Sequence, residues 1–427
     1  MVALACVRGS RILKNLAEDG SARVEPFGWV QWPENDDFSE QLMRVMSSAQ
    51  EGGSTVSECL GVATRIDPRD DGSWYREWKK IADDNRKRGN LAFGDGHART
   101  AQGHWLRATN YYRTALRFLA PGDLRKAAVV DLMQRCGRNY VGNLTRPGEA
   151  VEIPWSGDNV LQGYFLPAAG PAHRAPVVIC VGGTDYFKEE HLLGMPGYAH
   201  DRAMSLLIVD LPGQGYSQPD RRLGGSGIEW AISSCVDFLI ARDDVDQRRI
   251  AIFGLGVGAS FATRAAALDQ RFAAAVCDAG IWDLQERAFA IGRFGAGARA
   301  LSIGATIKEY SADSIVRRVK CPILVAQGQH DGLDAGGVAR FCNALKEQGV
   351  AIHLKRFAAS PADIENPALG REDIFDWISN RLDDAGTTAS SHGPAQVTPL
   401  SNVSRMDFGS RLNRRRPASR RPSPGAS

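Results

Sequence analysis

The order of hydrophobic and polar residues divides the chain into two kinds of segment. Between residues 38 and 138 apolar positions recur at helical spacing, which predicts amphipathic helices. From residue 149 onward they form short uninterrupted runs, a pattern typical of strands that are buried on both faces. The helices expected in the first part are residues 38–49, 74–86, 97–120 and 123–138.

The second part of the chain alternates strands with helices. We expect a hairpin at residues 151–166, later strands at 175–181, 205–210, 250–253, 273–277, 322–327 and 351–357, and helices at 227–241, 336–348 and 371–382. This alternation predicts an α/β fold whose mostly parallel sheet is covered on both faces. The expected domains are a helical one at 1–145, an α/β core at 146–384 and a disordered tail rich in Ser, Pro and Arg at 385–427.

The composition of the chain limits where in the cell the protein is expected and which partners it is expected to bind. The chain has no apolar run of the roughly 18 residues that span a membrane and no signal-peptide pattern at its start, so a cytoplasmic protein without a membrane partner is expected. The eight cysteines show no C-x-x-C spacing, which favours reduced thiols. Seven arginines between residues 401 and 427 lack interleaved aromatics, so we interpret them as a solvated tail and expect no nucleic-acid partner.

One glycine-rich stretch carries the main chemical signal. The run Gly254-Leu255-Gly256-Val257-Gly258 lies between an apolar strand and an alanine-rich helix. Enzymes that present a nucleophilic serine on such a turn have the pattern G-x-S-x-G. Gly256 occupies the serine position, and because glycine has no side chain, an acyl-enzyme cannot form on it.

Two aspartates are the candidate acid and base. Asp331 follows the strand expected at 322–327, at the sheet edge where α/β folds gather their sites; its alternative role is a helix cap. No histidine occurs at 357–367, where a triad would need one, and the later histidines, His353 and His392, are expected in a strand and in the tail. Asp363 is the nearest substitute. If the carboxylates of Asp331 and Asp363 lie close together, their mutual repulsion raises the pKa of one of them. The alternative, that both are solvated residues of turns, stays equally open.

Backbone donors and a pocket complete the candidate site. The N–H groups of Gly183, Thr184 and Val257 are expected to form an oxyanion hole, which stabilises developing negative charge. The side chains expected to line a substrate pocket are Asp185, Tyr186, Tyr111, Tyr112 and His104, although aromatics at helical spacing also occur in packed cores. Nothing in the sequence indicates a metal ion or an organic cofactor.

Several motifs together carry a family resemblance from about residue 28 to residue 382. They are Ser73-Trp74 with Glu77-Trp78, the segment 106–115, Gly182-Gly183-Thr184-Asp185 with Lys188-Glu189-Glu190, the segment 210–215, the turn at Gly256, Gly328 with Asp331, and Asp376-Trp377. The chain resembles α/β-hydrolases of the group of 2,6-dihydroxypseudooxynicotine hydrolase and the fermentation-respiration switch protein. That resemblance implies an α/β-hydrolase fold with an N-terminal helical lid, here residues 74–138, and a Ser–Asp–His triad.

The resemblance also shows how this chain departs from the family. Asp331 matches the triad acid, Gly256 stands at the serine position, and Asp363 or a neighbour stands at the histidine position. We therefore expect an enzyme that performs non-covalent acid–base chemistry, as a lyase, a cyclase or a rearrangement catalyst, on an apolar carbonyl-bearing small molecule. The alternatives are an inactive relative that binds a ligand or partner, and a hydrolase that activates water directly. Homodimerisation stays open.

Overall fold

Helices fill the first part of the computed structural model. The structure describes residues 31–120, 122–170, 174–183, 186–215, 227–278, 318–328, 335–357 and 367–390, all within one compact unit. The first helical elements are α2 (Asp36–Ser47), the 3-10 helix η1 (Ser48–Glu51), α3 (Val56–Ala63), α4 (Asp71–Gly94), α5 (Ala98–Leu116) and α6 (Arg125–Gly142). The four helices expected from periodicity are confirmed, and α3 is an addition.

Capping side chains fix where three of these helices begin. Asn35 accepts a hydrogen bond from the Phe38 amide, Thr55 accepts one from Glu58, and Asp70 accepts one from Gly72. Each bond satisfies an amide that has no partner within its helix. Asp70 thus sets the start of α4 three residues before the expected residue 74.

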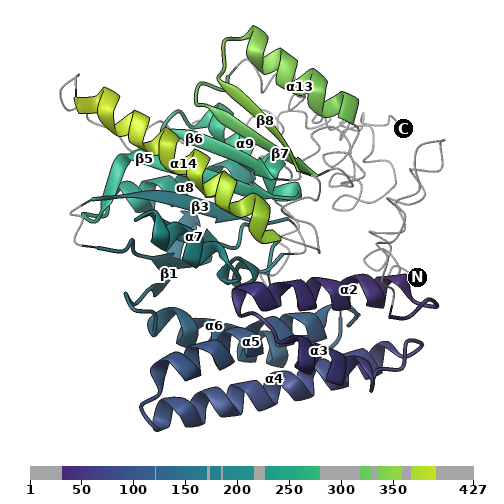
Figure 1. The fold of residues 1–427 in the computed structure, drawn as a ribbon. Helices are drawn as coiled ribbons and strands as arrows, with labels where there is room; N and C mark the ends of the chain where they lie inside the picture. The colour runs from purple at the N-terminus through teal and green to yellow at the C-terminus, as the bar shows by residue number, and fades with distance from the viewer. Residues whose placement is uncertain are drawn as a thin grey trace, which may run out of the picture. The chain divides into compact units, whose positions relative to one another are not determined.

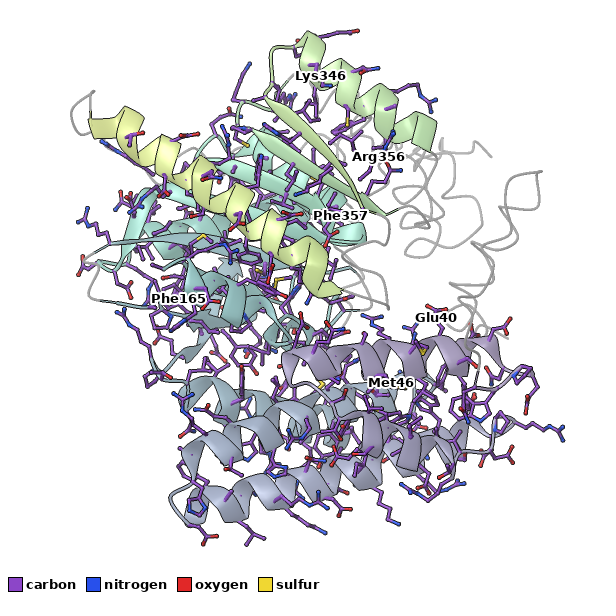
Figure 2. All side chains as sticks on the ribbon, in the orientation of Figure 1. Glu40, Met46, Phe165, Lys346, Arg356 and Phe357 are labelled. Carbon is purple, nitrogen blue, oxygen red and sulfur yellow. The ribbon has the colours of Figure 1, made fainter. Side chains whose placement is uncertain are left out.

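Large aromatic side chains hold the helices together. Trp74 and Trp78 of α4 are fully buried, with ring centroids 5.7 Å apart, and Trp78 lies 5.5 Å from Tyr111 of α5. The Trp74 indole donates to the Thr114 carbonyl at 2.8 Å, so its polar atom is satisfied within the core. Met46 of α2 packs against this core, whereas Glu40 of the same helix is exposed (Figure 2).

Eight strands form one sheet in the order β1-β2-β4-β3-β5-β6-β7-β8. Their bounds are β1 (Glu149–Ser156), β2 (Asn159–Leu166), β3 (Ala175–Val181), β4 (Ser205–Val209), β5 (Val245–Leu255), β6 (Ala274–Asp278), β7 (Ile323–Gly328) and β8 (Ile352–Phe357). The β1–β2 and β2–β4 pairs are antiparallel and the other pairs are parallel. The predicted hairpin and the mostly parallel sheet are confirmed.

Helices cover both faces of this sheet (Figure 1). One face packs against α7 (Met195–Asp201) and α14 (Pro367–Ser390), and the other against α8 (Gly227–Ile240) and α9 (Val257–Leu268). Helix α13 (Ala335–Glu347) contacts β8, and the 3-10 helix η2 (Lys188–Leu192) follows β3. The carboxyl ends of β3, β5, β6 and β7 consequently lie along the same edge of the sheet, where α/β folds place their sites.

Helix α14 continues to Ser390, beyond residue 384, where the folded part was expected to end. Arg249 lies 3.8 Å from Asp383, and the Thr387 hydroxyl donates to the carbonyls of Asp383 and Asp384. These contacts stabilise the end of α14, although the amino-acid composition there resembles that of the expected disordered tail. None of the described helices is long and apolar enough to cross a membrane.

Candidate functional site

The turn between β5 and α9 keeps the shape of a nucleophile-bearing turn. Gly256 has φ 59° and ψ −125°, a conformation that side-chain-bearing residues rarely adopt. Its N–H donates to the Asp278 carbonyl at 2.8 Å, and its carbonyl accepts from the Ala259 amide at 3.0 Å. Among the described residues, no atom lies within 4 Å of the place where a Cβ on Gly256 would stand. As far as these residues extend, the position where a serine would project is therefore open.

The two outer glycines of the turn, Gly254 and Gly258, are needed because a side chain at either position would clash with the backbone. A Cβ on Gly254 would collide with the Gly258 carbonyl, and a Cβ on Gly258 would lie 2.6 Å from the Val181 carbonyl and 2.7 Å from that of Gly182. Such separations are well below van der Waals contact, so the backbones could not approach as they do. Gly254 and Gly258 are thus required by packing, whereas no atom of a described residue crowds Gly256.

The loop after β3 is tied down next to this turn. The Gln214 side-chain amide donates to the Gly182 carbonyl at 2.6 Å, and the Tyr186 amide donates to the Gly183 carbonyl at 3.1 Å. Val181 pairs with Gly254 in parallel register, so Gly183 and Val257 follow the carboxyl ends of adjacent strands. Their joint role as oxyanion donors stays a prediction; Thr184 and Asp185 lie outside the described residues.

A buried charged cluster lies behind the same loop. The Lys188 ammonium lies 3.0 Å from the Glu189 carboxylate and 3.1 Å from that of Asp210, and all three residues are at most 4% exposed. Asp210 also accepts from the Lys188 amide at 2.7 Å, and the Tyr164 hydroxyl donates to Glu189 at 2.8 Å. One buried ammonium group is thus paired with two buried carboxylates, so the cluster contains one more negative than positive group.

This excess predicts a pH-dependent stability. Burial, opposed by Lys188 and reinforced by Glu189, raises the pKa of Asp210 from 3.8 to about 6. Between these values the folded state binds the extra proton, so the contribution of Asp210 to stability falls as pH rises from about 4 to 6. Relative to Asp210→Asn, the parent protein should lose on the order of 2 kcal/mol across that window, measured by urea unfolding at a series of pH values. A difference that does not change with pH would contradict this account.

The predicted lining residues of the long helix lie inside the helical part. Tyr111 and Tyr112 are fully buried, and their hydroxyls donate to Glu58 at 2.8 Å and to Asp83 at 2.5 Å. His104 Nδ1 lies 2.9 Å from the Asn85 side-chain oxygen. These contacts account for all three side chains as packing and hydrogen-bonding groups. Their role in a substrate pocket stays a prediction that no described contact supports.

The candidate acid and base, Asp331 and Asp363, both lie outside the described residues. The strands before them are described: β7 ends at Gly328 and β8 at Phe357, on the same edge of the sheet as the turn at Gly256. Sequence reasoning missed Arg44, which reaches from α2 to the Tyr186 hydroxyl at 2.8 Å. The two residues are 142 positions apart, so no local pattern could reveal the contact.

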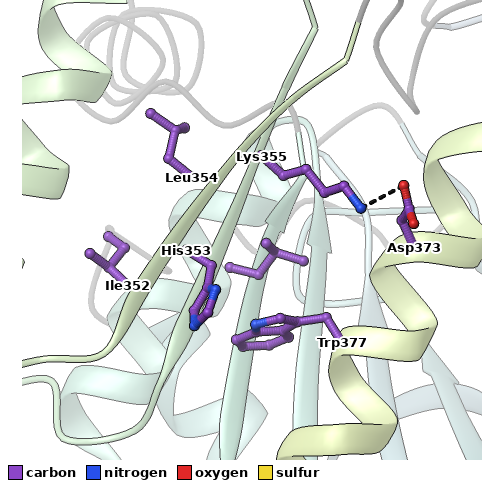
Figure 3. A pocket seen from close by; sticks show the side chains of 7 residues that line it. Ile352, His353, Leu354, Lys355, Asp373 and Trp377 are labelled. Atoms are coloured by element: carbon purple, nitrogen blue, oxygen red, sulfur yellow. Dashed lines mark ion pairs between the residues drawn. The ribbon is translucent and has the colours of Figure 1, made fainter.

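A separate cavity of about 420 Å³ lies between β8 and α14 (Figure 3). His353 and Trp377 form its floor with ring centroids 5.8 Å apart, and the Lys355 ammonium lies 2.5 Å from the Asp373 carboxylate at its rim. Strands β6 and β7 separate β8 from β5. This cavity is therefore not the space above Gly256.

Comparison with known proteins identifies the family. The Esterase FrsA-like family matches residues 32–284, and the Prolyl oligopeptidase family matches residues 216–374. The chain is 32% identical to Hydrolase acrC of Aspergillus aculeatus over 57% of its length, and 33% identical to 20-hydroxy-prefusarin hydrolase FUS2 of Gibberella moniliformis over 59%. It spans 62% of the length of each of these two relatives.

A solved structure agrees on the fold. The crystal structure of 2,6-dihydroxy-pseudo-oxynicotine hydrolase superimposes with a TM-score of 0.66 at 20% identity, covering 83% of this chain and 99% of that one. A structure titled AbyA5 Wildtype has a TM-score of 0.56 at 16% identity, covering 82% of this chain and 99% of that one. The sheet order, the turn at Gly256 and these matches lead to one conclusion: the chain belongs to the FrsA-like esterase family and has an α/β-hydrolase fold.

Proposed function

We propose that this protein is an α/β-hydrolase-type enzyme that works without a covalent serine. It would catalyse proton transfer, in an elimination, a cyclisation or a rearrangement, on an apolar carbonyl-bearing small molecule. The observation that carries the proposal is Gly256: its backbone conformation is that of a nucleophile-bearing turn, yet it has no side chain, and none of the described residues places an atom within 4 Å of where a Cβ would stand.

The backbone around Gly256 supplies the electrostatic part of the proposed reaction. Val257 is the first residue of α9, so its N–H lies at the positive end of the helix dipole. This N–H and that of Gly183 would donate to a substrate oxygen as it gains negative charge, which lowers the barrier to an enolate-like state. Because Gly256 has no side chain, part of the substrate can occupy the space above it.

Asp331 and Asp363 supply the proposed proton transfers. They follow β7 and β8 in the sequence, and the resemblance places Asp331 at the triad acid. Two carboxylates near one another would differ in pKa, so that one accepts a proton while the other donates one. The likeness to relatives with hydrolase names, one of them for 20-hydroxy-prefusarin, supports a natural product as substrate and a place in natural-product biosynthesis.

The proposal predicts that Asp331→Asn lowers turnover by about 100-fold or more, the usual contribution of a general base. Assays would start with 20-hydroxy-prefusarin and related carbonyl compounds, with products identified by mass spectrometry. A product of unchanged mass indicates rearrangement, loss of a leaving group or of water indicates elimination or dehydrative cyclisation, and gain of water indicates hydrolysis. The melting temperature should stay near that of the parent. Full activity in Asp331→Asn would exclude this residue as the base.

A second candidate is hydrolysis by a directly activated water, favoured by the open space at Gly256 and by the hydrolase names of the relatives. It predicts that the parent releases para-nitrophenol from para-nitrophenyl acetate and that Gly256→Ala retains this activity. If the parent converts no carbonyl compound and no ester, the remaining interpretation is a ligand-binding relative. Saturable binding without turnover would then be expected.

A further inference from the structure

We propose that Arg44 is a positioning residue: through Tyr186 it holds the loop that carries Gly183, one of the two backbone donors of the proposed site. The inference rests on the proposed function, because it explains how one of those donors is kept in place. Arg44 belongs to α2, in the helical part of the chain, whereas Tyr186 lies in the loop that follows β3. The helices would then do more than cover a substrate.

Arg44 contacts this loop and also the 3-10 helix η2 that follows it. Its Nη2 donates to the Tyr186 hydroxyl at 2.8 Å and to the Glu190 carboxylate at 2.9 Å, and its guanidinium carbon lies 5.2 Å from the Tyr186 ring centroid. Arg113 of α5 approaches the same carboxylate at 3.5 Å. Two guanidinium groups from the helical part therefore converge on the short segment between Tyr186 and Glu190.

Tyr186 transmits this contact to the glycines. A Cβ built on Gly182 would lie 2.6 Å from the Tyr186 Cβ and 2.7 Å from two of its ring atoms, so the ring packs directly on that peptide. The Tyr186 amide donates to the Gly183 carbonyl, and its own carbonyl accepts from Gly215, each at 3.1 Å. A shift of Tyr186 must therefore move the Gly182–Gly183 backbone. Oxyanion donors work only within a few tenths of an ångström of the right distance.

The energetics favour positioning over stability. The Arg44 side chain is 30% exposed, and an ion pair with one partly exposed member typically contributes little to folding stability. Its loss should leave the fold intact. A donor displaced by about 1 Å can nevertheless cost a site roughly two orders of magnitude in rate.

Binding of a phenolate tests this role. The probes are para-nitrophenolate, whose anionic oxygen needs donors, and para-nitroanisole, which has the same nitrophenyl ring but carries a methyl group on that oxygen and no charge. The two variants are Tyr186→Phe, which keeps the ring on Gly182 and removes only the hydroxyl, and Arg44→Lys, which keeps the charge and loses the planar guanidinium that reaches both acceptors. Each should weaken phenolate binding by about tenfold, leave anisole binding unchanged and shift the visible band of the bound phenolate to the red.

The control and a second measurement separate the possible results. Arg65→Lys alters an ion pair with Glu77 in the same helical part and should change neither binding constant. Hydrogen exchange should accelerate in peptides that contain Tyr186 and Gly215 in the two test variants. If the parent does not prefer phenolate to anisole, the proposed oxyanion site fails, and this inference fails with it. Another outcome is that the parent prefers phenolate to anisole while both variants bind the two probes as the parent does, or bind both probes equally more weakly. In either case the oxyanion site stands and only the role of Arg44 is overturned.

Discussion

Replacing Gly254 by alanine should prevent the chain from accumulating as a folded protein. The added methyl group would overlap the Gly258 carbonyl and lie 2.7 Å from the Ala259 Cα, both backbone atoms at the start of α9. Relief would require the whole helix to move away from β5. Overpacking against backbone that cannot yield should exceed about 4 kcal/mol, a loss that can remove most of a domain's stability. Circular dichroism and the soluble yield would report it.

Gly256→Ala provides the matched control, because it places the same methyl group two residues away in the same turn. No atom of the part of the chain that the structure describes lies within 4 Å of that methyl position, so the positive φ is the feature of this part that opposes the change. This strain should cost about 1–3 kcal/mol and leave a folded protein. If Gly254→Ala and Gly256→Ala destabilise the protein equally, steric crowding is not the reason why glycine is needed at position 254.

Lys188→Met should destabilise the folded protein by about 3–5 kcal/mol at neutral pH. The substitution keeps the volume of the side chain but leaves Glu189 and Asp210 buried without the cation they share. The loss should shrink as pH falls, since protonation of a carboxyl removes the repulsion. Urea unfolding followed by tryptophan fluorescence would give the free energies.

Two further variants make this result interpretable. Lys79→Met removes a partner of Asp83 on α4, where both side chains are about one-quarter to one-third exposed, and should cost less than about 1 kcal/mol. Combining Lys188→Met with Glu189→Gln and Asp210→Asn should recover much of the stability, because all three charges of this cluster are then removed. If the triple variant stays as unstable as Lys188→Met, packing by the lysine stem rather than charge explains the effect.

The fold could be predicted where the signal is local. The hairpin β1–β2, the strand β3 and the glycine turn each follow from neighbouring residues, and the structure confirms them. Strand β5 begins at Val245, whereas only residues 250–253 were expected. Residues 246–249 are polar and half-buried, so they belong to the strand without forming an apolar run. Hydrophobicity therefore revealed the buried centre of that strand and missed its start.

The candidate site could be predicted only in part. The turn at Gly256 was found because its glycine spacing is a local pattern, but the Arg44–Tyr186 and Lys188–Asp210 contacts join distant segments. The spacing of Tyr111 and Tyr112 was compatible with a pocket or a core, and a helix buried on several faces shows the same pattern. Asp331 and Asp363 stay predictions because the structure does not describe them.

The division of labour among the three turn glycines bears on how this protein could change over evolutionary time. A side chain at Gly254 or Gly258 would clash with the backbone, whereas one at Gly256 would meet no atom of the described residues within 4 Å of its Cβ. A glycine codon of the GGT or GGC kind becomes a serine codon by a single base exchange, so a hydroxyl could reappear there without an intermediate that fails to fold. Lineages with this turn could thus drift between attacking and non-attacking chemistry while every descendant keeps the same scaffold.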